Sequence, residues 1–136
     1  MTLDLQVAVE PVRSGEELVA RARAVVRAEA EALLDLEQRI GESIVEAVRL
    51  IESASGRVVV SGIGKSGIIG RKIAATLTST GTPAIFLHPV EGLHGDLGIV
   101  GRGDVALLIS KSGETDELTG LVEYLVRLGV PIVALT

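Results

Sequence analysis

The sequence predicts an α/β domain in which helices flank a parallel β-sheet. A succession of strand, serine-containing loop, helix, Gly-x-Pro and strand runs from Val58 to Leu87 and recurs from Ala106 to Leu135. Each such unit joins two parallel strands by a right-handed helical crossover. The chain has 136 residues, the length of one domain. We therefore expect three layers, with four parallel strands in the middle and further helices at the N-terminus.

Residues 1–13 contain a proline and follow no helical or strand period, so we expect a tail there and one domain over residues 14–136. Ser14 and Glu17 have the spacing of a capping box at a helix start. Apolar residues then recur at helical spacing, with a break expected near Gly41. The positions expected to face inward are Leu18, Ala22, Val25, Ala32, Leu33, Leu36, Ile40, Ile44, Ala47, Val48 and Ile51.

The middle of the chain predicts a strand, a glycine-rich turn, a helix and a second strand. The β-branched run at residues 57–61 is typical of a buried parallel strand. The turn is expected at residues 62–67, and the helix ends at Gly81-Thr82-Pro83 because proline cannot continue it. The second strand is expected at residues 84–87. The inward positions of this helix are expected to be Ile68, Ile69, Ile73, Ala74 and Leu77.

The last third begins with a long connection over residues 88–103, which we expect to be a functional loop. A third strand is expected at residues 104–109 and a tight turn at 110–113. The helix over residues 115–128 is followed by a fourth strand from residue 132. The inward positions of that helix are expected to be Leu118, Leu121, Val122 and Leu125.

Composition excludes several classes of protein. There is no cysteine, which excludes a disulfide scaffold and a cysteine nucleophile. The net charge of −5 and an aromatic fraction of 1% argue against binding to nucleic acid. No apolar run has the length of a membrane span, and the first residues lack a basic signal-peptide region. We expect a cytoplasmic protein with no membrane and no nucleic-acid partner.

The first glycine-rich loop has Gly62, Gly64 and Gly67 in a G-x-G-x-x-G pattern between a strand and a helix. A dinucleotide site would also need an acid at the end of the next strand, where Leu87 is followed by histidine. A Walker A motif would need a glycine at Val59. Two alternatives remain: a helix N-terminus that binds an anion with its N–H groups and a lysine, or glycines required only for close packing.

The second loop combines small donors at the start of a helix. Residues 110–115 supply three hydroxyls, a glycine and Lys111. A phosphate monoester needs many short donors and little bulk. A single hydroxyl, from Ser112 or Thr115, would be enough for an N-cap. Three hydroxyls therefore favour a phosphate site.

The only histidines, His88 and His94, lie in the long connection beside carboxylates. Such a group could bind zinc. Loop histidines more often hydrogen-bond or transfer protons, and we favour those roles. An adventitious or inhibitory metal is favoured over a structural one.

Three segments together resemble the sugar isomerase (SIS) domain: Ser61–Gly67, His88–Gly98 and Ser110–Thr115. More narrowly, they resemble arabinose 5-phosphate isomerases of the KpsF/GutQ group. The resemblance implies a three-layer SIS fold and an aldose–ketose isomerase. Such an enzyme interconverts D-ribulose 5-phosphate and D-arabinose 5-phosphate through an enediol, and its product is used in Kdo and lipopolysaccharide biosynthesis.

The resemblance also implies roles for individual residues. Lys65 and Glu117 match catalytic positions, and His88 matches a position associated with zinc that turnover does not require. From the residues alone, Lys65 could stabilise an enediolate or the phosphate. Glu117, without the resemblance, is better explained as a first-turn acid that favours the helix dipole. The candidate substrate-binding residues are Gly64, Ser66, Gly81, Thr82, His88, His94, Ser110, Ser112 and Thr115.

Two departures from the family pattern are visible. Lys111 stands where the family commonly has an amide or another polar residue. The family also continues beyond the position of Thr136, with another catalytic glutamate, a histidine and paired CBS modules, so we expect an incomplete domain and weak, phosphate-dependent binding with little turnover. A homo-oligomer, a tetramer by resemblance, is expected. The alternative functions are a non-catalytic sugar-phosphate sensor and an oligomerisation unit.

Overall fold

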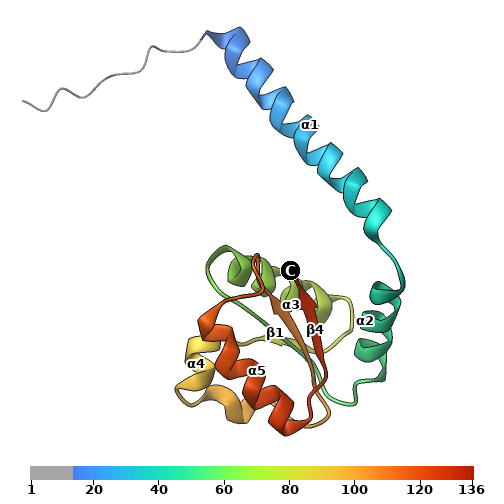
Figure 1. Cartoon of the computed structure of the whole chain (residues 1–136), viewed down its shortest axis with the longest axis vertical. Coiled ribbons are helices and arrows are strands. Elements are labelled where there is room, and N and C mark those ends of the chain that lie inside the picture. Colours follow the sequence, from blue (N-terminus) through green and yellow to red (C-terminus); the bar gives the residue numbers. More distant parts are fainter. Residues whose placement is uncertain (1–13) are drawn as a thin grey trace, which may run out of the picture. The chain divides into compact units, whose positions relative to one another are not determined.

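The computed structural model describes residues 14–136, so the expected tail lies outside the described residues. The chain divides into two compact units, Met1–Gly41 and Glu42–Thr136, and each is described by itself (Figure 1). In the described part of the chain, no helix combines the length and apolar character needed to cross a bilayer.

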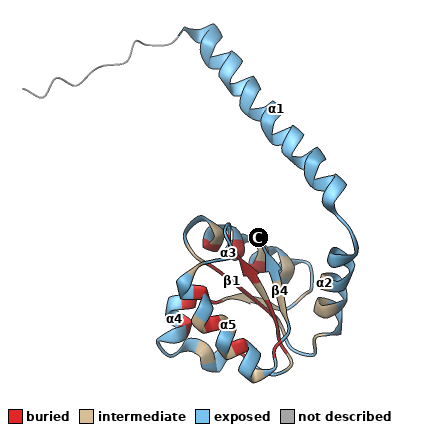
Figure 2. Ribbon diagram, viewed as in Figure 1, coloured by how far each residue is buried: buried red, intermediate tan, exposed pale blue. Residues whose placement is uncertain are grey.

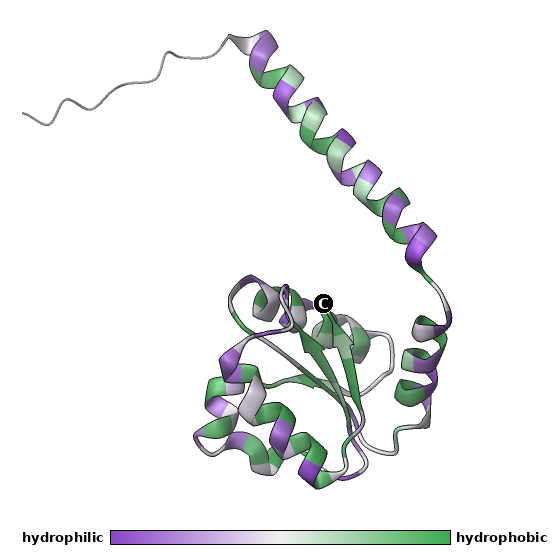
Figure 3. Ribbon diagram, viewed as in Figure 1, coloured by the Kyte–Doolittle hydropathy of each residue, from purple (hydrophilic) through white to green (hydrophobic). Residues whose placement is uncertain are grey.

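The described part of the first unit is the helix α1, Gly15–Arg39. Its capping box is confirmed: the Glu17 N–H donates to Ser14 Oγ at 3.2 Å, and the Ser14 N–H donates to the Glu17 carboxylate at 2.8 Å. The expected burial is wrong, because α1 has no buried residue (Figure 2). Hydrophobic residues recur along the helix (Figure 3), and the large apolar side chains among them are exposed.

The second unit contains a four-stranded parallel sheet in the order β2-β1-β3-β4. This topology confirms the two predicted crossover units. The elements in chain order are α2 Glu42–Ser53, β1 Val58–Gly62, α3 Gly64–Ser79, β2 Ala84–Phe86, α4 Pro89–Leu93, the 3-10 helix η1 Asp96–Ile99, β3 Val105–Ile109, α5 Asp116–Leu128 and β4 Ile132–Leu135.

The sheet separates two hydrophobic clusters, so the predicted three layers are confirmed (Figure 1). Val58 and Val60 of β1 face α2 and α3, where Ala74 is buried. Val59 points to the other face, towards α5. Alternate residues of a strand point to opposite faces, which explains why this strand is apolar throughout. The α5 residues buried against the sheet are Leu118, Leu121 and Leu125, as predicted.

Glycines end α3 and α5 as the sequence predicts. Gly81 has a φ of 98° and Gly129 a φ of 76°, both in the left-handed region. After α3 the Thr82 N–H donates to the Leu77 carbonyl at 2.9 Å. The corresponding bond after α5 joins the Val130 N–H to a carbonyl in the last turn at 3.0 Å. Each motif satisfies a carbonyl that the helix end would leave unpaired.

Two local expectations are wrong. The glycine-rich turn is shorter than predicted, because α3 already begins at Gly64. The connection over residues 88–103 is a folded segment, with α4 and η1 inside it. Pro89 at the first position of α4 is the signal that predicts this helix, since proline is favoured there.

The inward face predicted for α3 is also wrong in part. Ile68 and Ile69 are exposed, whereas Gly67 and Gly70 are buried. A Cβ on Gly70 would lie 3.0 Å from the Phe86 ring, so α3 packs too close to the sheet for larger side chains there. Small residues therefore take the inward positions, and both isoleucines turn outward.

Candidate functional site

The two loops singled out in the sequence follow neighbouring central strands. β1 pairs with β3 up to the pair Gly62–Ile109. All strands are parallel, so the loops after β1 and β3 emerge side by side at the carboxyl edge of the sheet. Ligands of open α/β sheets bind at this edge. The topology thus brings residues 63–66 and 110–115 together.

The three positions of the first loop are occupied by glycine for different structural reasons. A Cβ on Gly62 would lie 2.9 Å from the Ile109 carbonyl oxygen, and a Cβ on Gly67 would lie 2.7 Å from the Gly62 carbonyl oxygen. These two glycines are required by close packing. Gly64 has open space around it and a φ of 56°. The close-packing alternative therefore holds for Gly62 and Gly67, and anion binding at the start of α3 stays a prediction.

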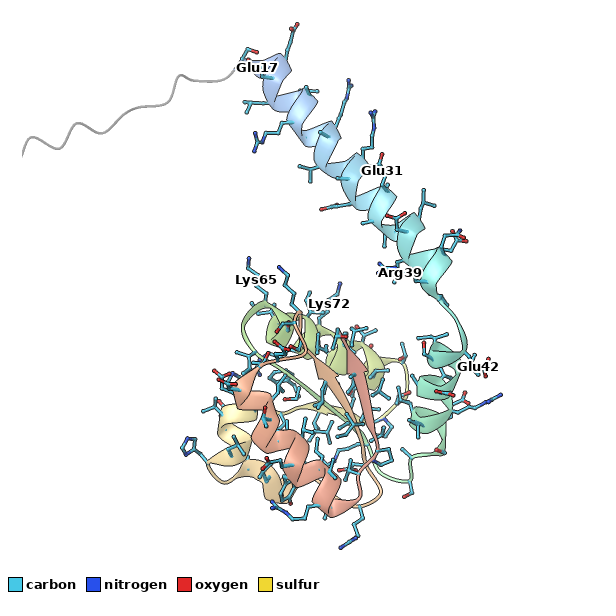
Figure 4. The ribbon with its side chains drawn as sticks, viewed as in Figure 1. Glu17, Glu31, Arg39, Glu42, Lys65 and Lys72 are labelled. Atoms are coloured by element: carbon cyan, nitrogen blue, oxygen red, sulfur yellow. The ribbon has the colours of Figure 1, made fainter. Side chains whose placement is uncertain are left out.

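The start of α3 presents backbone donors without a side-chain cap. Ile63 occupies the N-cap position and makes no side-chain cap bond. The first bond of the helix is donated by the Gly67 N–H to the Ile63 carbonyl, at 3.2 Å. The N–H groups of Gly64, Lys65 and Ser66 therefore have no partner in the helix. Lys65 extends from this turn away from the sheet (Figure 4).

The hydroxyls of the second loop make hydrogen bonds within the loop and stabilise its conformation. Ser110, which is buried, pairs with the Thr115 hydroxyl at 2.9 Å and accepts from the Gly113 N–H at 3.1 Å. Ser112 accepts from the Glu114 N–H at 3.3 Å. Gly113 has a φ of 73°, which lets the chain turn here.

This network leaves donors for a ligand. A hydroxyl that accepts a bond from an N–H group keeps its own proton to donate. Ser112 is such a hydroxyl, and it is exposed. In the pair of Ser110 and Thr115 one hydroxyl donates to the other, and the second keeps its proton. The loop is therefore shaped by its own N–H groups and still presents O–H donors, a combination suited to a phosphate.

The start of α5 adds further donors and acids. Thr115 is at the N-cap position but makes no side-chain cap bond, because its hydroxyl pairs with Ser110. The structure thus disfavours a simple capping role for this threonine. Glu117 lies in the first turn of α5 and is exposed in this chain. It shares the sheet edge with Lys65, on a helix that covers the opposite face.

Ser61 is a buried residue that the sequence analysis did not single out by itself. Its hydroxyl donates to the Leu87 carbonyl at 2.6 Å and so ties the ends of β1 and β2. His88 follows directly and is half-buried at the N-cap of α4. A lone polar residue at the end of an apolar strand is the signal that identifies Ser61.

The two histidines do not form a metal site with each other. His88 and His94 flank α4 at its two ends, about 9 Å apart along the helix axis at 1.5 Å per residue. Within residues 14–136 no three histidine, aspartate or glutamate side chains gather closely enough to hold a metal ion. The residues of one chain therefore do not fit a zinc site, and no step of the chemistry below is assigned to zinc.

Gly81 and Thr82 lie at the other edge of the sheet. They follow α3 and precede β2, so they are beside the amino ends of the strands. There they line a hollow of about 230 Å³ together with residues of the connection between α2 and β1. One chain does not bring them next to Lys65 or to the loop at residues 110–115.

Comparison with characterised sequences finds close relatives. A probable arabinose 5-phosphate isomerase of Haemophilus influenzae is 50% identical over 108 residues, which are 79% of this chain and 32% of that protein. Arabinose 5-phosphate isomerase KdsD of Escherichia coli K12 is 44% identical over 134 residues, which are 98% of this chain and 39% of that protein. The chain thus spans roughly a third to two fifths of the length of these relatives.

Comparison with solved structures supports the same fold. The c3406 protein of E. coli CFT073, solved in complex with arabinose 5-phosphate, is similar with a TM-score of 0.85 and 37% identity. The match covers 90% of this chain and 65% of that one. The profile of the SIS domain matches residues 50–136, more than half of the chain. The parallel sheet, its helical layers and this match show that the chain belongs to the SIS domain family.

Proposed function

We propose that this chain carries the chemistry of an aldose–ketose isomerase that interconverts D-ribulose 5-phosphate and D-arabinose 5-phosphate. The hydroxyl loop at residues 110–115, next to Lys65 at one sheet edge, is the observation that carries the proposal. Support also comes from the relatives named arabinose 5-phosphate isomerase and from the similar structure that binds arabinose 5-phosphate.

The phosphate of the sugar binds at the second loop. Ser110, Ser112 and Thr115 offer hydroxyl donors, and the N–H groups at the starts of α3 and α5 add to them. Gly64 and Ser66 contribute through their backbone. The phosphate is remote from the reacting carbons, so its binding energy orients C1 and C2 for reaction.

The reaction moves one proton between neighbouring carbons. Glu117 removes a proton from C1 of the ketose, and the electrons of the C–H bond form the enediolate, whose negative oxygen Lys65 stabilises. The C1 hydroxyl then passes its proton to the C2 oxygen, and Glu117 returns its proton to C2, which gives the aldose. His88 and His94 contact the sugar hydroxyls. No cofactor is required.

The active assembly is a homo-oligomer, a tetramer, located in the cytoplasm and contributing to Kdo and lipopolysaccharide biosynthesis. Gly81 and Thr82 belong to the substrate-binding set, although they lie at the other sheet edge of their own chain. Residues 14–136 are assigned to the SIS domain.

Turnover and binding of D-ribulose 5-phosphate by the 136-residue chain test this proposal. We expect Lys65→Ala and Glu117→Gln to lower turnover by about 100-fold or more, because each removes a group needed at the enediolate. Ser110→Ala should weaken binding by about 10-fold, the effect of one lost hydrogen bond to a charged group. Arg49→Ala and Ser79→Ala are matched controls outside the site and should leave both values unchanged.

Each outcome separates the candidate functions. Turnover that depends on Lys65 and Glu117 supports the isomerase. Binding that depends on Ser110, with no turnover in any variant, supports the sugar-phosphate sensor. Equal binding of ribulose and its phosphate, or no binding at all, contradicts both.

A further inference from the structure

The outward side of α3 is an apolar surface bordered by cations. Ile68 is 69% exposed and Ile69 is 50% exposed. Lys65 and Lys72 lie three to four residues before and after them, so all four share one side of the helix. Figure 4 shows both lysines extending from α3 on the same side. We call these four residues the α3 face.

Two neighbouring isoleucines at this exposure are informative. Single exposed apolar residues are normal on a protein surface, whereas a contiguous pair beside the candidate site indicates an interaction surface. The inward positions of α3 are taken by glycines and Ala74, so these isoleucines contribute nothing to the core of the second unit. The two isoleucines are exposed because the other side of α3 packs too closely against the sheet to hold large side chains.

The charged side chains on α3 and in the sequence around it are all positive. The chain has a net charge of −5, but no aspartate or glutamate occurs between Glu52 and Glu91. Among residues 14–136, neither Lys65 nor Lys72 makes an ion pair with an acid. Two α3 faces placed against each other would bring lysines together. A partner for this surface must therefore be apolar at its centre and acidic at its borders.

The second half of α1 has this complementary pattern. Leu33 is 66% exposed, and Glu29 and Glu37 stand one turn before and one turn after it. The two glutamates are about 12 Å apart along the helix, and the two lysines of the α3 face are about 10 Å apart. A leucine can therefore pack on the isoleucines while one glutamate meets Lys72, and Lys65 stays available for the substrate. We call Glu29, Leu33 and Glu37 the α1 face.

We propose that the α3 face binds the α1 face of a second copy of this chain. The inference rests on the homo-oligomer proposed above and names the surfaces that form it. In a two-fold dimer the contact occurs twice, with each copy offering one α1 face and receiving another. The pairing covers exposed apolar side chains of both helices and sets their charges in opposition.

Sedimentation of the full chain over a range of concentrations is the first test. We expect the wild type to associate and Ile69→Lys to weaken association by about 10-fold or more. Val126→Lys is the matched control, because Val126 is 65% exposed on α5, and it should associate as the wild type does. Unchanged association of Ile69→Lys overturns this interface and leaves the homo-oligomer standing. A monomeric wild type overturns both, and sugar-phosphate binding is measured independently.

Reversal of charge tests the pairing of the two faces. Lys72→Glu and Glu37→Lys should each weaken association, because each places like charges together. The double variant restores opposite charges and should regain association. Glu123→Lys, an exposed reversal on α5, is the control without effect. A double variant that associates more weakly than either single variant contradicts the proposed pairing.

The absence of cysteine from the chain permits a direct test of proximity. A chain with Leu33→Cys is mixed with a chain with Ile69→Cys, and a short bismaleimide is added. We expect a cross-linked product of twice the chain mass that contains one chain of each kind. Failure of the mixture to cross-link overturns the proposal. A chain with both Leu33→Cys and Ile69→Cys that forms only an intramolecular cross-link also overturns the proposal.

Discussion

At the scale of single residues, the glycines and serines near β1 and β3 determine how closely the chain approaches itself. Gly67 lies against the Gly62 carbonyl, and Gly62 lies against the end of β3. Ser61 holds the end of the neighbouring strand through one buried hydrogen bond. Small side chains here fix the position of Lys65 relative to the hydroxyl loop, so changes in volume at these positions act on the site.

Gly67→Ala tests this tight packing. The new Cβ would lie 2.7 Å from a backbone oxygen that cannot move without shifting β1. We expect the free energy of unfolding to fall by about 2 kcal/mol, the usual effect of overpacking, as measured by urea denaturation. Gly98→Ala is the matched control, because a Cβ there has open space. Equal stability of the two variants would show that α3 moves away from the sheet easily.

Side-chain direction is where prediction from sequence was weakest. Helical periodicity placed Ile68 and Ile69 inward because they are the largest apolar residues of that segment. In the structure the contact with the sheet is so close that Gly67 and Gly70 occupy the inward positions. Periodicity records which residues are apolar, but the distance between two layers decides which size of side chain fits. The position of the loop between β3 and α5 was predicted better, because it depends on residues that are close in sequence.

At the scale of elements, the amino ends of β1 and β3 are joined by one buried carboxylate. Asp104 accepts from the Arg57 N–H at 2.9 Å and from the Gly101 N–H at 2.8 Å. It is 6% exposed, and the Arg57 guanidinium lies 4.0 Å away. The bonds fix the starts of the two strands whose other ends carry the site.

Asp104→Asn should loosen this junction. The amide oxygen can accept from one N–H group, but the amide nitrogen then faces the second donor. We expect a loss of about 2 kcal/mol in the free energy of unfolding, because a buried donor is left unpaired. Asp96→Asn, an exposed change at η1, should have no measurable effect. Thermal unfolding with equal midpoints for both variants would contradict the role of Asp104.

Most strands and long helices could be predicted from the sequence, whereas η1 could not, and α4 is indicated only by Pro89. The strands follow from β-branched runs, and the ends of α3 and α5 follow from Gly81 and Gly129. The segment between β2 and β3 shows no helical or strand periodicity. Its folding depends on contacts with residues that are distant in sequence. One example is the bond from the Tyr124 hydroxyl to the Leu97 carbonyl at 3.2 Å. Local sequence patterns do not predict such contacts.

At the scale of the whole molecule, the two units differ in what stabilises them. The second unit has two hydrophobic clusters and contains every candidate site residue. In α1 no residue is buried, although the capping box and helix-forming residues favour its helical conformation. Most of the stability of a helix in a protein comes from the packing of its apolar face rather than from intrinsic propensity. The helical conformation of α1 should therefore depend on association, whereas that of the second unit should not.

Hydrogen exchange at two protein concentrations tests this difference. We expect the amides of α1 to be better protected at high concentration, while those of β1 and β3 stay equally protected at both. Leu33→Lys should abolish the concentration dependence, because lysine retains helix propensity but removes the apolar contact. Val126→Lys should leave it intact. Protection of α1 that is the same at both concentrations, and unchanged by Leu33→Lys, would mean that this helix is stabilised without a second copy.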